Sequence, residues 1–359
     1  MSLDSLSPRV NLEQSRKQAK DLLKAFRRAD PATLDRIRWN HPRCRGLTDQ
    51  QIRARPFALA DAQLVVARLH YFQSWLDLLR HIETLERQDP HVRRFEDAAD
   101  AIIAGDVAAL QALLQQHPDL VTQRSTRAHH APLLHYVSAN GIEDYRQQSP
   151  ANAVEVARVL LEAGAEVDAT SDAYGGFSTA LGLVATSTPP RLAGVQIPLI
   201  DLLLGHGAAI DGVRPGGSTV LAALHNGCPE AARALAQRGA QIPDIEAAAG
   251  IGRPDLVVRM AAGASPQELG IALLAAAANR AVGTMDLLIR LGAPVETQNE
   301  YGGTVLCHVL WFAHHGEAAL IVDYARAIDL LVRAGARTDV YAEMARDIDA
   351  VRRRAAAAA

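Results

Sequence analysis

Two residues of this sequence, one glutamate and one tyrosine, are candidates for acid–base chemistry. Glu143 follows an apolar segment, and Tyr174 stands in a Tyr-Gly-Gly triplet. Groups of these two types can move protons when they converge on one substrate. They are the only catalytic candidates that we name. The remainder of the sequence favours a protein without enzymatic activity but leaves that question open.

The histidines and glycines do not form a recognisable metal or cofactor motif. His129-His130 and His314-His315 are adjacent pairs, which do not readily place two imidazoles on one metal ion. Gly175-Gly176 is not followed by the Gly-Lys-Ser/Thr of a phosphate loop, and neither GxSxG nor HExxH occurs. We therefore expect no metal and no cofactor.

Aromatic and polar residues near predicted turns are the candidates for binding. One group is expected to converge beneath two loops, 142–152 and 187–196, and to form a pocket of ligand size: Tyr136, Asn140, Glu143, Tyr174, Thr186 and Gln196. A second group lies farther along the chain: His225, Asn226, Tyr301, His308 and Trp311. A solvated surface position competes with a functional role for Glu143, His225 and Asn226, and Trp311 could equally pack against the next element.

Composition indicates which elements must position these residues. The chain has 359 residues, of which 49% are hydrophobic and only 4% aromatic, a balance that favours closely packed helices of small residues. The formal charge is −3, but residues 1–94 hold 18 Lys and Arg against 11 Asp and Glu. This basic part could meet an acidic partner or dock on the acidic remainder of the chain.

Compartment follows from cysteine usage and from hydropathy. Cys44, Cys228 and Cys307 are far apart, which fits a reducing cytosol, and no apolar run is long enough for a membrane span. The start MSLDSLSPRV lacks the apolar core of a signal peptide. We expect a cytoplasmic protein.

One pattern returns along the chain from about residue 95. An apolar helical stripe ends in a Gly-centred segment, as in EAGAEVDA, GHGAAIDG, QRGAQIPD, AAGASPQE, RLGAPVET and RAGARTDV. The capping glycines are Gly164, Gly207, Gly239, Gly263, Gly292 and Gly335, and each is expected to adopt the left-handed conformation that ends a helix. Each unit therefore reads as turn, helix, connection, helix.

This pattern resembles the ankyrin repeat family. Pro132-Leu133-Leu134-His135 matches the family's T-P-L-H segment with Ala131 in place of Thr, and Asn299 to Gly302 matches its turn. The resemblance implies an all-α ankyrin-repeat solenoid of about seven irregular units, in which His135 ties adjacent turns by hydrogen bonds. It also implies that binding, where it occurs, uses surface residues that differ from case to case.

Unit lengths depart from the regular period of the family. Successive capping glycines lie 43, 32, 24, 29 and 43 residues apart. The long units carry insertions at 142–152, 187–196 and 314–324. Pro150, Pro189 and Pro190 predict loops for the first two, whereas the third is apolar enough to extend a helix.

The ends of the chain do not repeat. Residues 1–90 are expected to form an N-terminal helical cap domain, 91–340 the ankyrin repeat stack, and 341–359 a C-terminal capping helix with an Ala tail. Helices are predicted over 12–30, 58–69 and 75–83, with a small core of Phe57, Leu64, Phe72, Trp75 and Leu79. The segment 57–83 resembles a helical extension that precedes the repeats in some bacterial ankyrin proteins.

Three hypotheses about function follow. The leading one is a protein-interaction scaffold that binds an extended peptide or protein on its concave or finger surface, because Tyr174 and Tyr301 flank a stretch, 212–297, with no aromatic residue. The second is a small-molecule binder or enzyme that uses the pocket beneath 142–152 and 187–196. The third treats the insertions as surface loops without a partner. Nucleic acid and membrane partners are not expected.

Overall fold

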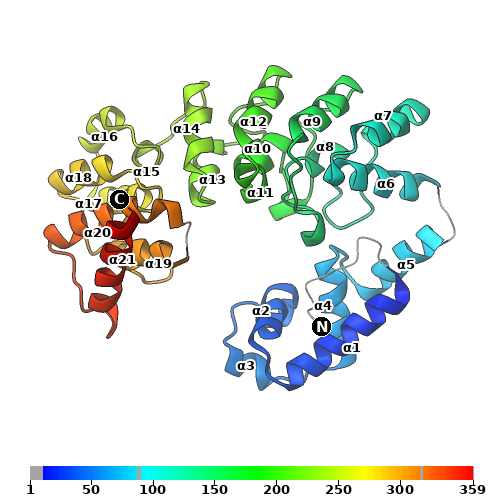
Figure 1. Ribbon diagram of the computed structural model, residues 1–359, viewed down its shortest axis with the longest axis horizontal. Coiled ribbons are helices and arrows are strands. Elements are labelled where there is room, and N and C mark those ends of the chain that lie inside the picture. The colour runs from blue at the N-terminus through cyan, green and yellow to red at the C-terminus, as the bar shows by residue number, and fades with distance from the viewer. Residues whose placement is uncertain (1–10, 87–89, 316–317, 359) are drawn as a thin grey trace. The chain divides into compact units, whose positions relative to one another are not determined.

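The computed structural model describes residues 11–86, 90–315 and 318–358, and the chain divides into two compact units, Met1–Ala209 and Ile210–Ala359. In the described part of the chain the secondary structure is helical, apart from three isolated β-bridges at turns. Figure 1 shows the helices of each unit in chain order. The two units are described separately below.

The first unit begins with helices that do not repeat. They are α1 (Leu12–Arg27), α2 (Pro31–Asn40), α3 (Asp49–Arg53), α4 (Leu59–Leu69) and α5 (Trp75–Glu86). Side-chain oxygens cap their first turns, since the Asp30 carboxylate accepts from the Thr33 N–H at 2.8 Å and the Ser74 hydroxyl from the Asp77 N–H at 3.2 Å. The predicted N-cap role of Ser74 is confirmed.

The core of these helices differs in register from the prediction. Phe72 is buried, and Phe57 and Trp75 pack against the core, as expected. On α4 and α5, however, Val65 and Leu78 are the fully buried residues instead of Leu64 and Leu79. Helix α4 packs against α1 and α5. The faces that α4 and α5 bury are therefore shifted by one residue from the predicted faces.

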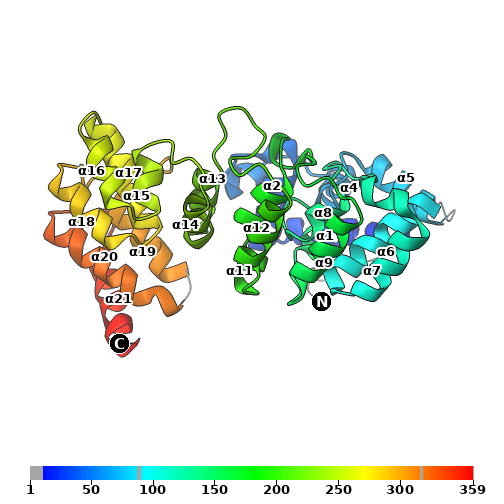
Figure 2. The same ribbon diagram turned by 90° about the horizontal axis from the view of Figure 1, so that it is seen from above.

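Three helix pairs complete the first unit. They are α6 (Pro90–Ala104) with α7 (Val107–Gln116), α8 (Leu133–Tyr136) with α9 (Ala153–Glu162), and α10 (Ala180–Ala185) with α12 (Gln196–Gly205). First helices pack on first helices, α6 on α8 and α8 on α10, while α9 packs between α7 and α12. Figure 2 shows these pairs from above. The arrangement is that of stacked ankyrin-type units, each a turn followed by two helices.

The second predicted loop of this unit is partly helical. Residues Thr188–Leu192 form α11, whose first turn holds Pro189 and Pro190. Proline is tolerated there because the N–H groups of a first helical turn have no partner within the helix. The expectation of a loop was therefore wrong at this segment, since the prolines begin a helix instead of preventing one.

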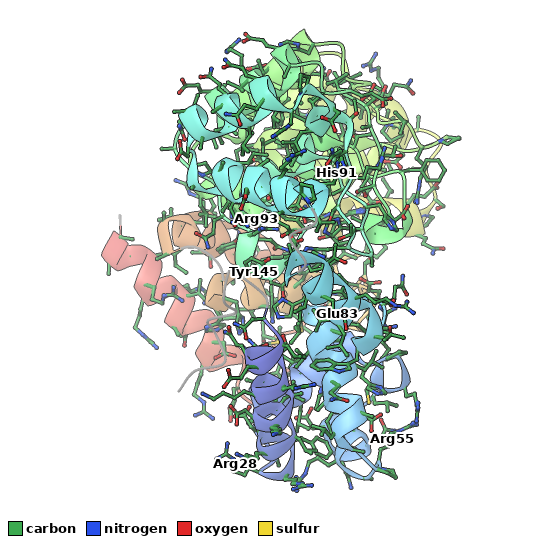
Figure 3. The ribbon with its side chains drawn as sticks, turned by 90° about the vertical axis from the view of Figure 1, so that its right-hand side faces the viewer. Arg28, Arg55, Glu83, His91, Arg93 and Tyr145 are labelled. Carbon is green, nitrogen blue, oxygen red and sulfur yellow. The ribbon has the colours of Figure 1, made fainter. Side chains whose placement is uncertain are left out.

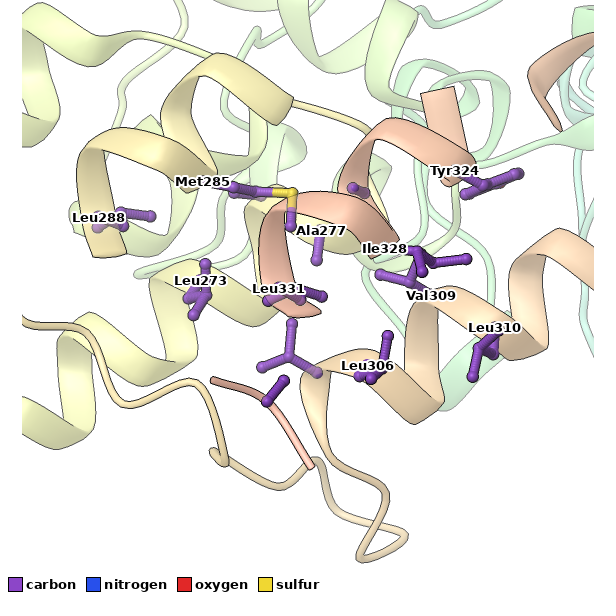
Figure 4. Packing of buried hydrophobic residues seen from close by; sticks show 14 of the residues in the cluster. Leu273, Ala277, Met285, Leu288, Leu306, Val309, Leu310, Tyr324, Ile328 and Leu331 are labelled. Carbon is purple, nitrogen blue, oxygen red and sulfur yellow. The ribbon is translucent and has the colours of Figure 1, made fainter. Parts of the chain in front are cut away.

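The second unit consists of four helix pairs and a closing helix. They are α13 (Thr219–His225) with α14 (Pro229–Gln237), α15 (Ile245–Gly250) with α16 (Pro254–Ala261), α17 (Pro266–Ala278) with α18 (Val282–Arg290), α19 (Val305–His315) with α20 (Ile321–Arg333), and α21 (Met344–Ala358). Figure 4 shows part of its core, where Leu273, Met285, Leu306 and Leu331 converge from α17, α18, α19 and α20. The predicted all-α repeat fold is confirmed in both units.

Glycine ends most of the second helices. Gly164, Gly207, Gly239, Gly292 and Gly335 have φ between 88° and 99°. Gly263 lies outside the left-handed region, contrary to the prediction. The reason is local, because Ser265 caps α17 two residues later, with its hydroxyl accepting from the Glu268 N–H at 3.3 Å. The chain therefore enters α17 directly, without the extended turn (finger) that precedes the first helix in other units.

Candidate functional site

Four charged side chains lie buried together in the first unit. Arg127 comes from the turn before α8 that the bridge between Arg124 and Pro132 closes, which we call the first finger turn. Glu96 comes from α6, and Glu143 and Arg146 come from the 142–152 insertion. Arg127 Nη2 and Arg146 Nη1 each lie 2.8 Å from Glu96 Oε2, and Arg127 Nε is paired with Glu143 Oε1. Arg127 is 1% exposed and Glu143 0%. Two cations and two carboxylates therefore pair out of contact with solvent, and the half-buried carboxylate of Asp100 is a third anion, 2.5 Å from Arg146 Nη2.

Burial and charge act in opposite directions on these carboxylates. Burial alone would raise the pKa of Glu143, but Arg127, the His129 hydrogen bond and Arg146 outweigh it and hold the pKa far below its ordinary value. Burial is likewise outweighed at Glu96 by Arg127 and Arg146, and its pKa is lowered. Both carboxylates are thus ionised across the physiological pH range.

Two of the sequence-predicted site residues belong to this cluster. The Tyr136 hydroxyl donates to Glu143 Oε1 at 3.2 Å, and both side chains are fully buried. Burial, with Glu143 as the next largest cause, raises the pKa of Tyr136. The predicted catalytic candidate Glu143 is thus already an ion-pair partner enclosed by protein. The Arg127 and Arg146 cations were not identified from the sequence, although two arginines near acidic helices are a signal that could have found them.

The charged cluster also joins the N-terminal helices to the repeats. Arg127 Nη1 donates to the His70 carbonyl at 3.2 Å, and the Ala128 N–H donates to the Tyr71 carbonyl at 2.7 Å. The Arg127 guanidinium also lies 5.2 Å from the centre of the Phe72 ring. Figure 3 shows this junction, with Tyr145 between α5, which carries Glu83, and α6, which carries Arg93.

Three predicted binding residues do meet at the surface of the first unit. The Tyr174 hydroxyl donates to Asn140 Oδ1 at 2.6 Å, and Asn140 Nδ2 donates to Thr186 Oγ1 at 3.0 Å. Tyr174 is nevertheless 69% exposed and has φ +52°. Gln196 is buried apart from them, donating to the Val184 and Ser187 carbonyls, and so holds the insertion in place.

The finger of the second unit presents an aromatic side chain that the turn does not need. Asn299 Oδ1 accepts from the N–H groups of Tyr301 at 3.1 Å and Gly303 at 2.9 Å, and Gly302 has φ +78°. These contacts form the turn, and a bridge between Gln298 and Thr304 closes it. Tyr301 is 86% exposed. The predicted use of Asn299 and Gly302 in the turn is confirmed.

Helix α19 carries a second exposed aromatic group. Trp311 is 56% exposed, and its ring stacks on His315 at 4.7 Å and meets the edge of Phe312 at 5.1 Å. His308 stacks on the same Phe312 at 4.9 Å. Trp311 therefore rests on its own helix and leaves most of its surface to solvent.

His225 and Asn226 end α13 in the same unit. His225 Nε2 lies 2.6 Å from Glu246 Oε1, and this hydrogen bond raises the pKa of the imidazole. The Asn226 amide donates to the Ala222 carbonyl of its own helix at 2.8 Å. His225 thus has a partner on α15, and Asn226 acts locally at a helix end.

His135 has the structural role that the family resemblance implies. Its Nε2 donates to the Ala169 carbonyl at 2.8 Å, which joins two successive turns. Burial lowers the pKa of His135 to about 4. Among the residues that the structure describes, no group of His, Cys, Asp and Glu side chains could hold a metal ion. None of the described helices is both long and apolar enough to cross a membrane.

Comparison with solved structures finds a protein with a similar repeat. The ankyrin repeat domain of human ASB11 matches 67% of this chain and 98% of its own, at 20% sequence identity and a TM-score of 0.40. No protein-family model and no curated protein matches the chain. Function must therefore be argued from the chain's own residues.

Proposed function

We propose that the protein is an interaction scaffold that binds a protein or an extended peptide through aromatic residues of its finger turns. The observation that carries this proposal is the exposure of Tyr174 (69%) and Tyr301 (86%), in a fold that buries most of its other large apolar side chains. Exposed aromatic side chains on rigid turns are typical anchors of protein interfaces. Trp311, which is 56% exposed, is a further candidate anchor in the second unit.

The state of the acid–base candidates supports a scaffold over an enzyme. Glu143 is enclosed and paired with Arg127, and Tyr136 is buried against it. Of the proposed pocket, only Tyr174, Asn140 and Thr186 remain near solvent, and they hydrogen-bond to one another. A phenol, an amide and a hydroxyl suit recognition better than proton transfer at neutral pH.

Affinity capture with matched variants tests the proposal. The full chain, the double variant Tyr174→Ala with Tyr301→Ala, and the control Trp39→Ala are used as baits in one lysate. Trp39 is 69% exposed but lies on α2 of the N-terminal helices. We expect a protein that wild type and the control retain and that the double variant loses, at closely similar melting temperatures.

The opposite pattern contradicts the scaffold. If every protein retained by wild type is retained equally by the double variant, the exposed tyrosines are not interface anchors.

We place the function in the cytoplasm, which is supported by three free cysteines, Cys44, Cys228 and Cys307.

A further inference from the structure

Exposed arginines gather at one end of the N-terminal helices of the first unit. Residues 27–61 hold eight arginines against four aspartates, with no lysine and no glutamate, which gives a net formal charge of +4 (8 − 4). Most of these arginines belong to three segments, which are the end of α1, the turn after α2 and the end of α3 with the residues after it. Figure 3 shows Arg28 and Arg55, which follow α1 and α3, at the same end of these helices.

Ring contacts bring these three segments together. The centre of the Phe57 ring lies 4.5 Å from that of Phe26 on α1 and 6.1 Å from that of His41, which directly follows α2. An exposed arginine stands two residues from each of these rings: Arg28, Arg43 and Arg55. Segments that are separate in the sequence thus present their arginines at one end of the fold.

Two of these arginines also act on the same buried atom. Burial raises the pKa of the Cys44 thiol, and Arg55 and Arg43 oppose this rise. Both guanidinium groups therefore lie near one sulfur atom, although Arg55 follows α3 and Arg43 comes from the turn after α2. One extended anion can reach both.

The positive charge at this end is not compensated by the aspartates of the same segments. Each aspartate already has a partner, at a helix cap, in an ion pair with Arg38 or on the imidazole of His41: Asp30, Asp35, Asp49 and Asp61. By contrast, six exposed arginines form no ion pair and no side-chain hydrogen bond with any residue that the structure describes: Arg27, Arg28, Arg43, Arg45, Arg53 and Arg55. We call these six residues the arginine surface. Their guanidinium groups are open to a ligand.

The chemistry of the arginine surface fits phosphate groups that repeat along a polymer. A guanidinium binds phosphate through two parallel hydrogen bonds, and several arginines in one area favour a chain of anions over a single ion. Protein and membrane interfaces also use large apolar side chains, whereas residues 41–57 expose none. Nucleic acid backbones carry regularly spaced phosphates, and proteins bind them largely through these groups.

We propose that the arginine surface binds the phosphate backbone of a nucleic acid without reading its base sequence. The arginines pair with phosphates along the strand and displace the counterions that these phosphates hold. Sequence patterns did not predict this partner, because the arginines stand in separate segments that the fold brings together. Binding here involves no finger tyrosine and does not depend on the scaffold function.

Salt-dependent binding of defined nucleic acids tests the proposal. A labelled oligothymidylate strand and a labelled DNA duplex of the same length are titrated with the full chain, and fluorescence anisotropy follows binding between about 50 and 200 mM NaCl. We expect at least one of them to bind with a Kd below about 100 µM at the lowest salt, and its affinity to fall steeply as the salt concentration rises. The tighter binder shows whether the surface prefers a single strand or a duplex.

Two matched variants localise the binding. The first neutralises part of the arginine surface: Arg43→Gln, Arg45→Gln, Arg53→Gln and Arg55→Gln. It should bind at least about tenfold more weakly, and the slope of log K against log salt should fall by about 3 for a single strand. The control makes the same charge change at exposed arginines of the repeats and the closing helix: Arg158→Gln, Arg259→Gln, Arg333→Gln and Arg353→Gln. It should keep the affinity and the slope of wild type.

Three results would overturn the proposal. The first is that neither nucleic acid binds at about 100 µM protein in about 50 mM NaCl. The second is that the two variants, at wild-type melting temperatures, bind alike, because the arginine surface is then not the site. The third is that polyglutamate or phosphatidylserine vesicles bind at least as tightly as the nucleic acids and are weakened by the first variant, which assigns the surface to an acidic protein or a membrane.

Discussion

Arg127 contacts both buried carboxylates of the charged cluster as well as the N-terminal helices. It pairs with Glu96 and Glu143, donates to the His70 carbonyl and covers the Phe72 ring. Buried ion pairs contribute little net stability relative to apolar replacements of both partners, but removing one partner leaves a buried charge uncompensated. The position therefore tolerates single substitutions poorly.

Replacing Arg127 by Met should destabilise the protein strongly. The change leaves Glu143 and Glu96 with only Arg146 as a cation, so the free energy of unfolding should fall by about 3 to 5 kcal/mol. Urea unfolding of the full chain at neutral pH measures this loss. Arg93→Met, at an exposed position on α6, should stay within about 0.5 kcal/mol of wild type. Equal stability of the two variants would contradict the structural role of the cluster.

Buried histidines predict a loss of stability in mild acid. Burial lowers the pKa of His70, His81 and His135 to about 4, from an unperturbed value of 6.5. The unfolded chain therefore binds protons below pH 6.5 that the folded chain does not bind until about pH 4. The unfolding free energy should fall as the pH falls through this window, by up to about 1.4 kcal/mol per pH unit for each histidine.

A single substitution isolates one of these protons. His135→Asn lowers stability at pH 7, because the hydrogen bond to the Ala169 carbonyl is weakened, but its unfolding free energy should depend on pH less steeply than that of wild type. Identical slopes for wild type and His135→Asn between pH 6.5 and 4.5 would show that His135 is not kept neutral by burial.

At the scale of elements, glycines define where helices end and where a finger follows. Gly164 has φ +98° and ends α9 before a finger, whereas Gly263 lies outside the left-handed region and is followed at once by α17. A Cβ at either glycine would meet no atom within 4 Å. The two sites therefore differ in backbone conformation and not in available space.

This pair of glycines gives a matched test. Gly164→Ala should cost about 1 to 2 kcal/mol, because alanine is strained in the left-handed region. Gly263→Ala should be neutral or stabilising by up to about 1 kcal/mol, since it restricts the unfolded chain. Thermal unfolding of both variants measures the difference. A loss of stability at Gly263 as large as that at Gly164 would contradict the assigned conformations.

Elements were more predictable from the sequence than contacts between distant residues. Five of the six Gly-ended stripes, the Ser74 cap and the Asn299 turn depend on local backbone chemistry, and each of these is confirmed by the structure. The insertion at 187–196 was predicted as a loop from its prolines, but proline also begins helices, as α11 shows. The Gly-ended pattern is a local signal, so it did not show that the turn between units is missing after Gly263.

The candidate site was less predictable because it depends on contacts between residues that are distant in the sequence. Glu143 and Tyr136 were selected because polar and aromatic residues stood near a turn, but their burial is decided by Arg127 and Arg146, and Arg127 also joins α6 to the finger turn. Tyr174, Asn140 and Thr186 were expected to converge, and they are hydrogen-bonded to one another. Their role in binding stays a prediction.

At the scale of the whole molecule, each unit carries its own exposed finger aromatic. Tyr174 belongs to the first unit and Tyr301 to the second. We propose that one extended peptide or protein surface contacts both side chains, because exposed aromatic side chains on turns are typical interface anchors. This is the central claim about function, and it concerns the same partner at both positions.

Site-specific photo-cross-linking tests that claim most directly. A photoreactive phenylalanine analogue is placed at Tyr174 in one variant and at Tyr301 in another, with Trp39 as the control position, and cross-linked proteins are identified after irradiation in lysate. The account predicts that positions 174 and 301 capture the same protein, which position 39 does not. Different proteins at the two positions, or none that position 39 fails to capture, would contradict it.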